Sequence, residues 1–423
     1  MTRTRAGIPW LVAVLAVGPC GGCGSRPAGE ADRLSFLVLA GEKSVWSEIA
    51  DRFRAETGMA VELVEGPNAT DLRENLYATS LMARDDSFDL VYMDVTWTPK
   101  FAGAGWLSPL DEAFTKDELD ALLEAPLEAG RYRGRLYRVP VRTDVGLLYV
   151  RRDLLERAGL AAPESFDDLS NAARTLQSPP EMWGYLWQGS QYEGLVCVFL
   201  EVLRGHGGFW VDPKTLDVGL DRPEAIAALD FLRRCRTADA ISPPGVTTLK
   251  EDDSRRLFQS GRAVFLRNWT YVWKLAQAPG SPVKDRVAAT PMVHLAGIPA
   301  TGTLGGWGFG ISRYSRHAES AVRFVRFAIS LTAQRILCAK TGYWPARREA
   351  YSDPELLAAN PFLAEAGRLN AVAVARPSIP RYALASDILA RHLSAALSGL
   401  VEEKKALDAA ARETRLLLSA GKS

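Results

Sequence analysis

The chain has 423 residues, and its 51 basic and 50 acidic side chains leave a net charge of +1. This length predicts about two domains of ~200 residues, and the 47 % hydrophobic and 24 % charged content excludes a disordered or fibrous protein. The balanced charge lacks the excess of basic residues that is typical of nucleic-acid-binding proteins. The only long apolar run is N-terminal, which excludes a polytopic membrane protein. The 11 Trp and 12 Tyr favour a surface that stacks on flat, neutral ligands.

The N-terminus has the pattern of a secretory signal. Two arginines precede a short apolar stretch, residues 8–17, and small residues with two cysteines follow it. Small residues before a Cys, with Gly-Ser after it, resemble the bacterial lipobox, in which the Cys becomes the lipidated N-terminus. Cys23 follows a glycine, whereas Cys20 follows a proline, which is a poor cleavage position. We predict a lipoprotein signal peptide at 1–22, a lipid anchor on Cys23 and a tether at 23–33; a plain signal peptide is the alternative.

The remaining cysteines and the histidines indicate no reactive centre. Cys197, Cys235 and Cys338 lie far apart without CxxC spacing, so we expect small buried side chains rather than a disulfide or a metal site. No pair of the four histidines has HxxxH spacing, and GxSxG and GxGxxG motifs are absent. We therefore predict no metal site, no cofactor and no catalytic nucleophile, which favours a binding protein over an enzyme.

The predicted elements alternate between strand and helix. The first five are strand 35–41, helix 45–57, strand 61–64, helix 71–84 and strand 88–93. We expect Ser44 to cap the first helix and Gly58 to end it, and we place Leu72, Leu76 and Leu81 on one side of the second. Such a β-α-β-α-β order implies a parallel sheet with right-handed crossovers.

The later elements continue this alternation. They are strands 146–150 and 263–266 and helices 152–158, 165–176, 195–204, 223–236, 318–330 and 386–418. The fold class is therefore predicted to be α/β.

Two acidic residues lie where such a fold binds ligands. In open α/β sheets the ligand sits beyond the carboxyl ends of the strands. That rule selects Glu42, after the first strand, and Asp94, at the end of the third. Asp94 could instead cap the segment that follows it, and Trp97, three residues further on, could belong to the core.

Three further segments place polar or aromatic residues beside strands. Arg142 and Asp144 precede strand 146–150, and as positions i and i+2 of an extended segment they face the same way, into a cleft. Trp269 follows a strand, and Trp307 stands among glycines, where a core tryptophan would have bulky neighbours. Rings of this kind stack on pyranose faces, while carboxylates accept hydroxyl protons. Arg142 would ion-pair with Asp144 and orient it for a neutral hydroxyl, or contact the ligand directly, or be a solvated surface residue; we favour the first.

Six stretches together carry a family resemblance. They are Asp94-Val95-Thr96-Trp97, Val139-Pro140 through Leu154, Gln191-Tyr192-Glu193-Gly194-Leu195, Arg267-Asn268-Trp269 with Tyr271, Gly305-Gly306-Trp307, and Arg376-Pro377 with Pro380 and Tyr382. In order and spacing they resemble the carbohydrate-binding lipoproteins of ABC importers, extracellular solute-binding protein family 1, and within it the trehalose/maltose-binding branch. The resemblance covers essentially the whole mature chain. Arg142 departs from it, because the branch often has an aromatic residue there.

The resemblance implies a type II periplasmic-binding-protein fold, in which two α/β lobes close on a sugar. Crossovers near residues 143, 288 and 346 would divide the chain. The implied N-terminal lobe is 34–142 plus 289–345, and the C-terminal lobe is 143–288 plus 346–423.

The resemblance also implies the roles of site residues. Glu42, Asp94 and Asp144 would bind hydroxyls, Trp269 and Trp307 would stack on rings, Gly306 would offer its backbone N–H, and Arg376 would reach across from the C-terminal part. Trp97, Glu193 and Tyr271 complete the implied set, and Arg142, which departs from the branch, is added to the predicted site from its own position beside Asp144.

The implied protein is a lipid-anchored extracytoplasmic receptor. It would deliver a sugar, such as the disaccharides trehalose or maltose, to the permease of an ABC importer without any bond chemistry. We expect a monomer held at the membrane by its lipid, in the periplasm or at the cell surface, with no nucleic-acid partner. The alternatives are an extracellular glycan-active enzyme and a binding protein for an anionic sugar or a polyol.

Overall fold

The computed structural model describes residues 33–67, 70–379 and 381–420, so Cys20, Cys23 and the predicted signal peptide lie outside the described residues. The strands are β1 (Arg33–Leu39), β2 (Ala60–Gly66), β3 (Leu90–Asp94), β4 (Arg131–Tyr132), β5 (Arg135–Leu136), β6 (Val139–Val145), β7 (Leu147–Arg151), β8 (Trp183–Leu186), β9 (Ala263–Asn268), β10 (Val287–Thr290), β11 (Gly302–Ile311), β12 (Trp344–Pro345) and β13 (Ala373–Val374).

The α-helices are α1 (Lys43–Thr57), α2 (Thr70–Met82), α3 (Thr98–Gly103), α4 (Lys116–Asp120), α5 (Glu124–Glu128), α6 (Arg152–Ala158), α7 (Phe166–Leu176), α8 (Glu193–Gly205), α9 (Pro223–Arg236), α10 (Glu251–Gln259), α11 (Val272–Ala276), α12 (Ala318–Ala328), α13 (Leu331–Thr341), α14 (Pro354–Ala359), α15 (Ala366–Asn370), α16 (Tyr382–Leu397) and α17 (Glu403–Ser419). Short 3-10 turns are η1 (Ala40–Glu42), η2 (Pro244–Thr248), η3 (Arg348–Ser352) and η4 (Pro361–Glu365). The class is α/β, as predicted.

The sheets are mixed rather than wholly parallel. β1 and β2 pair in parallel, as their β-α-β order predicts. β3, however, pairs antiparallel with β11, which pairs on its other side with β6, again antiparallel. A second sheet has the order β10-β7-β9-β8. The predicted parallel sheet is therefore wrong for β3, because its partner comes from more than two hundred residues further along the chain.

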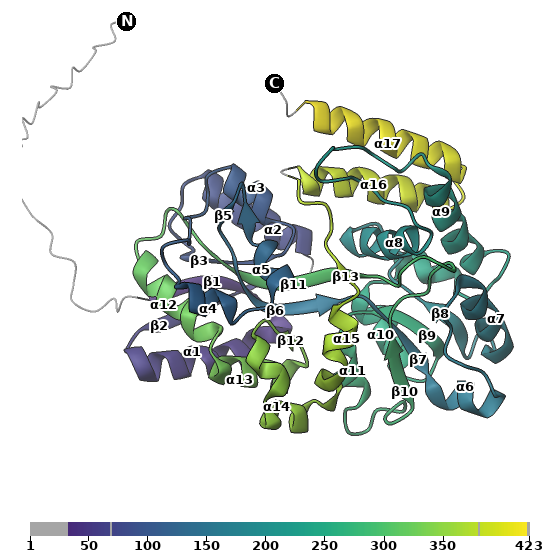
Figure 1. Cartoon of the computed structure of the whole chain (residues 1–423), viewed down its shortest axis with the longest axis horizontal. Coiled ribbons are helices and arrows are strands. Elements are labelled where there is room, and N and C mark those ends of the chain that lie inside the picture. Colours follow the sequence, from purple (N-terminus) through teal and green to yellow (C-terminus); the bar gives the residue numbers. More distant parts are fainter. Residues whose placement is uncertain (1–32, 68–69, 380, 421–423) are drawn as a thin grey trace, which may run out of the picture. The chain divides into compact units, whose positions relative to one another are not determined.

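The hydrophobic core is divided between two lobes. One cluster joins buried residues of α1, β1, β3, α12 and α13 to the start of β6, and these elements form the N-terminal lobe. The other two clusters lie around β7–β10 with α7–α9, α16 and α17, and form the C-terminal lobe. Figure 1 shows the two groups on either side of β6 and β11. We keep the predicted lobe boundaries near residues 143 and 346 as a proposal, since the cores divide where β6, β11 and β12 cross. The boundary near 288 does not fit these cores, because Ala289, Met292 and Val293 pack in clusters of the C-terminal lobe.

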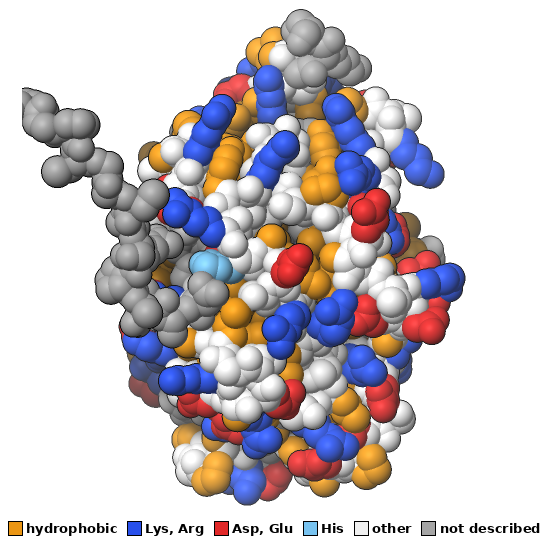
Figure 2. All heavy atoms as spheres, turned by 90° about the vertical axis from the view of Figure 1, so that its left-hand side faces the viewer, with side chains coloured by type: hydrophobic (Ala, Val, Ile, Leu, Met, Phe, Trp, Pro, Cys, Tyr) orange, Lys and Arg blue, Asp and Glu red, His pale blue; other side chains and the backbone are white. Residues whose placement is uncertain are grey.

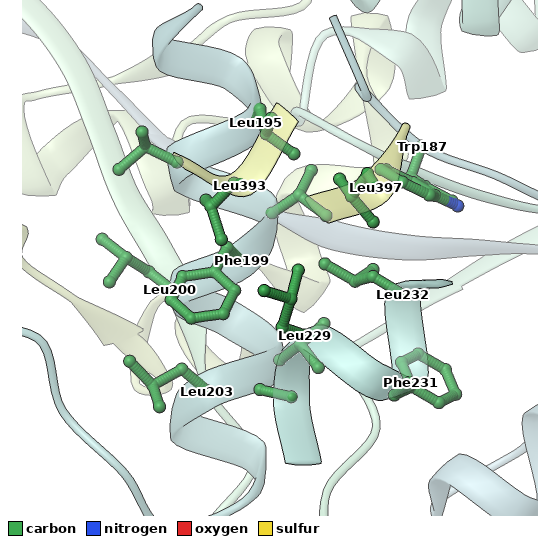
Figure 3. Packing of buried hydrophobic residues seen from close by; sticks show 14 of the residues in the cluster. Trp187, Leu195, Phe199, Leu200, Leu203, Leu229, Phe231, Leu232, Leu393 and Leu397 are labelled. Atoms are coloured by element: carbon green, nitrogen blue, oxygen red, sulfur yellow. The ribbon is translucent and has the colours of Figure 1, made fainter. Parts of the chain in front are cut away.

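The sheet of the C-terminal lobe is covered on both faces. Along β7, Leu147 and Tyr149 belong to one cluster, whereas Leu148 and Val150 belong to the other. This alternation is the two-residue period of a strand with both faces buried. Figure 3 shows how α8, α9 and α16 interlock on one side, with these side chains in contact: Leu195, Phe199, Leu203, Leu229, Leu232, Leu393 and Leu397. The lobe is thus a rigid support for residues at its strand ends.

Charged side chains of both signs are interspersed over the face of the molecule on the N-terminal-lobe side, with hydrophobic ones in small groups between them (Figure 2). This pattern agrees with the net charge of +1. None of the described helices is both long and apolar enough to span a bilayer.

Three local predictions need correction. Glu42, not Ser44, precedes the first helix, although Gly58 ends it at φ 76° as expected. Residues 386–418 form two helices, because the chain turns at Gly399, which has φ 77°. On α2, Leu72 and Leu76 are 51 % and 46 % exposed. The buried side of α2 instead carries polar groups such as Arg73 and Glu74 together with Tyr77 and Leu81, which a hydrophobic pattern does not reveal.

The three described cysteines are Cys197, Cys235 and Cys338. Each is free and buried, as the sequence predicts.

Candidate ligand-binding site

Two buried strands bring the central predicted residues together. β6 is buried throughout and carries Arg142 and Asp144, and β11 is buried throughout and carries Gly306 and Trp307. In the strand register, Trp307 lies opposite Arg142 on one side and opposite Asp94, the last residue of β3, on the other. The site therefore lies where the chain crosses between the lobes.

Glycines in β11 are required by its close packing on β6. A Cβ added to Gly308 would lie 2.3 Å from the Val139 carbonyl oxygen, and one added to Gly306 would lie 2.6 Å from that of Arg142. Gly306 also has φ 136°, which residues with a side chain rarely adopt. The Gly-rich stretch is thus a central strand, and Trp307 belongs to the hydrophobic core although its neighbours along the chain are glycines.

Arg142 is the centre of an ion-pair network on the N-terminal-lobe side. Its Nη2 lies 3.3 Å from Glu42 Oε1 and its Nη1 lies 3.3 Å from Asp144 Oδ2. Its Nε donates to the Tyr92 hydroxyl at 3.1 Å, and its guanidinium lies 3.7 Å from the centre of the Tyr343 ring. Burial opposes the charged guanidinium, but the surrounding tyrosines and carboxylates outweigh it and raise the pKa of Arg142. A solvated surface Arg142 is therefore excluded.

Asp144 ties the loop after β9 to β6. The backbone N–H and the hydroxyl of Thr270 donate to Asp144 Oδ1 at 2.9 Å and 2.5 Å. Burial raises the pKa of Asp144 even though Arg142 and Thr270 favour its charged form. Because Thr270 lies between Trp269 and Tyr271, this carboxylate also fixes the loop that carries both predicted aromatic residues.

Arg376 connects the lobes. From the segment before α16 it donates through Nη2 to Asp94 Oδ1 at 3.0 Å and through Nη1 to Glu193 Oε1 at 2.6 Å. Glu193 also accepts from the hydroxyls of Tyr382 and Ser386. Asp94 Oδ1 accepts the N–H and hydroxyl of Thr96, whereas no hydrogen-bond donor reaches Oδ2 within the described part of the chain. Asp94 thus fixes the turn that follows β3, but it does not cap α3, whose N-cap is Trp97 without a side-chain cap bond.

The aromatic residues divide into buried and accessible ones. Trp97 and Trp307 are 2 % and 7 % exposed, belong to the N-terminal-lobe core and meet edge to face at 5.4 Å. Trp269 is only half-buried; one part of its ring lies near Gly305, and the Arg267 guanidinium is 4.3 Å from its centre. Tyr271 meets the Tyr343 ring at 6.1 Å. Trp269 is therefore the more accessible ring.

The sequence missed several polar residues of the site. The Arg73 guanidinium lies 4.2 Å from the centre of the Trp307 ring, and its buried Nε and Nη1 have no hydrogen-bond partner among the described residues. Glu74 accepts from Lys100 Nζ at 2.8 Å, and Tyr343 donates to Glu42 at 2.9 Å. Charged residues on the inner side of a helix, as on α2, are the one sequence signal that could have found Arg73 and Glu74.

A cleft between the lobes lies beside Asp94. It has a volume of about 120 Å³. The residues that line it come from α2 and the turn after β3 on one side and from α8, the segment before it and α16 on the other: Thr70, Asp71, Glu74, Thr96, Trp97, Gln191, Tyr192, Glu193, Tyr382, Ala383, Ser386, Asp387 and Ala390. Burial raises the pKa of Glu74 at its wall, although Lys100 acts in the opposite direction.

Two α/β lobes with buried, hydrogen-bonded charges at their junction define a type II periplasmic binding protein. Residues 39–335 match the family of bacterial extracellular solute-binding proteins, and the chain belongs to that family. A probable ABC transporter-binding protein of Deinococcus radiodurans is 31 % identical over 335 residues, which are 78 % of this chain and 79 % of that protein. The protein is accordingly a solute-binding protein of the ABC-transporter type and not an enzyme.

Two further similar proteins bear on the ligand. The maltose-bound structure of T. maritima MalE3 has a TM-score of 0.86 and 34 % identity, with 92 % of this chain and 99 % of that one covered. A mannitol-binding protein of Pseudomonas aeruginosa is 25 % identical over 372 residues, covering 81 % of this chain and 83 % of that protein. The names of these proteins thus span a sugar and a polyol.

Proposed function

We propose that this protein is an extracytoplasmic receptor for a neutral carbohydrate, which it delivers to the permease of an ABC importer. The observation that carries the proposal is the pairing of buried charges at the junction between the lobes. Five carboxylates and five cations lie there: Glu42, Glu74, Asp94, Asp144 and Glu193, with Arg73, Lys100, Arg138, Arg142 and Arg376. These paired groups offer many hydrogen bonds to hydroxyls, and the further carboxylates Asp71 and Asp387 in the cleft lining disfavour an anion.

The similarity to a maltose-bound structure supports a disaccharide such as maltose or trehalose as the ligand. A polyol is the second candidate, and the limited space beside the Trp307 ring and Arg142 favours it. Arg73 lies against the Trp307 ring and Arg142 fills the space between Glu42 and Asp144, so little of this region is left for a second sugar ring. Hydrogen bonds from the charged side chains of both lobes to the ligand would draw the lobes together around it.

A thermal-shift screen of the mature protein without its anchor tests the proposal. The panel contains maltose, trehalose, glucose, mannitol and ribitol, together with citrate and glycine as non-carbohydrate controls. A ligand at 100 times its dissociation constant stabilises the folded state by about 2.7 kcal/mol. Stabilisation by a neutral carbohydrate, confirmed by calorimetric titration, is expected; stabilisation by the controls alone would contradict the proposal.

We further propose that a lipid on Cys23 anchors the receptor as a monomer. The support is the short apolar stretch that ends in small residues and cysteine. Cys23→Ala should release the protein into the soluble fraction and remove the acyl mass, and Cys20→Ala is the matched control. If the Cys23 variant remains acylated and bound to the membrane, the anchor lies elsewhere. Sedimentation equilibrium of the soluble form tests the monomer.

A further inference from the structure

The structure assigns a second role to Arg142: we propose that it is a specificity-determining residue, whose guanidinium holds the cation position between Glu42 and Asp144 and so excludes ligands that carry an amine. The inference rests on the proposed carbohydrate-binding function and refines it. It predicts that the receptor takes neutral polyhydroxy ligands and rejects amino sugars and amino polyols of the same shape.

The two carboxylates beside Arg142 have few acceptor positions left. A carboxylate offers about four lone-pair directions. Glu42 accepts from Arg142, Tyr343 and the Trp46 indole N–H. Asp144 accepts from Arg142 once and from Thr270 twice. Each carboxylate therefore keeps about one position for a ligand hydroxyl while Arg142 is in place.

The guanidinium is also held in one orientation. Its three nitrogens donate to three different residues, Tyr92, Asp144 and Glu42. Its flat face lies against the Tyr343 ring, and its side chain is 5 % exposed. Cation–π contact with a ring and a fixed fork of donors keep an arginine in place better than a lysine would be kept. A ligand that reaches Glu42 or Asp144 must therefore bind beside Arg142 rather than displace it.

Charge then decides which ligands fit. A neutral hydroxyl can donate to the remaining position on either carboxylate without desolvating a charge. The guanidiniums of Arg142 and Arg73, which both lie against the Trp307 ring, already balance the charges of Glu42 and Asp144. An ammonium group would therefore lose its hydration without any net attraction, and it would lie next to a buried guanidinium of like charge. Without Arg142, the pair Glu42 and Asp144 would be a buried double negative charge, which an ammonium would neutralise.

The test compares neutral and aminated ligands of the same shape. The pairs are glucose with glucosamine, glucitol with glucamine and trehalose with trehalosamine, each titrated by calorimetry at pH 6.5 so that the amines are charged. The wild type should bind the neutral member of at least one pair more tightly. In Arg142→Met and Arg142→Gln, affinity for that neutral ligand should fall at least about 30-fold, and the amine should become the preferred member of the pair.

Chemical rescue separates this role from a structural one. Guanidinium ion at low millimolar concentration should restore neutral-ligand binding to Arg142→Met, because it can enter the site between the two carboxylates. Arg151→Met is the matched control: Arg151 is 6 % exposed and bonds Asp153 at 2.8 Å, away from the predicted site residues. That variant should keep the wild-type preference and show no rescue.

The outcomes distinguish the two proposals. A wild type that binds no carbohydrate refutes the proposed function itself. A wild type that binds neutral carbohydrates but equally well their amines refutes the role of Arg142 without need of any variant. That role is likewise refuted if the Arg142 variants fold, as judged by circular dichroism, and keep the neutral preference.

Discussion

Removing Arg376 should push the two lobes apart, because two carboxylates that it now bonds would repel each other. Its guanidinium bonds Asp94 of the N-terminal lobe at 3.0 Å and Glu193 of the C-terminal lobe at 2.6 Å, and its side chain is 3 % exposed. Without it, two carboxylates face each other across the junction. Since both bond to one guanidinium, their oxygens lie at most about 8 Å apart, where like charges repel by about 2 kcal/mol at an effective dielectric constant of about 20.

This repulsion should act on the joined lobes and not on either lobe alone. We therefore expect Arg376→Met to weaken carbohydrate binding by at least about 30-fold, which corresponds to about 2 kcal/mol. Without ligand, Arg376→Met should have a larger radius of gyration than the wild type, as measured by small-angle X-ray scattering. The circular dichroism spectra of the two proteins should differ little.

Arg381→Met is the matched control for Arg376→Met. Arg381 lies five residues further along and donates only to the carbonyl oxygens of Leu417 and Ala420 among the described residues. It should leave affinity and scattering unchanged. If Arg376→Met binds ligand as the wild type does, then Arg376 does not control the approach of the lobes, and the inference from its two ion pairs is wrong.

Burial and packing lead to three more expected outcomes. Trp307→Ala should lower stability by about 3–5 kcal/mol because the ring is 7 % exposed, whereas Trp269→Ala should mainly weaken ligand binding; equal melting temperatures for the two variants would contradict this. Gly308→Ala should lower the melting temperature, since its Cβ would lie 2.3 Å from a carbonyl oxygen, whereas Gly367→Ala, with nothing within 4 Å, should be neutral or stabilising. Burial lowers the pKa of His206, so the unfolded chain takes up its proton first and stability should fall as pH drops through about 6.5; His206→Gln should flatten that part of the stability profile.

The positions of most elements could be read from local patterns. Helices 152–158 and 223–236 have their predicted bounds, and Ser165 caps α7 through a capping box. Caps, proline at a first turn and hydrophobic period are properties of neighbouring residues, so tertiary contacts seldom change them. The rule that ligands sit beyond the carboxyl ends of strands selected Glu42 and Asp94, and both are buried.

Residue partners, by contrast, were decided by the tertiary structure. No local pattern indicates that β11 inserts between β3 and β6, because pairing between distant strands depends on the whole fold rather than on local period. That insertion puts Trp307 in the core instead of on a surface. The same arrangement explains why Glu42, Asp94 and Asp144 are paired with arginines. Arg142 and Arg376 reach these carboxylates only when β6, β11 and the segment before α16 have come together. Because a buried charge without a partner is costly, burial then requires these pairs.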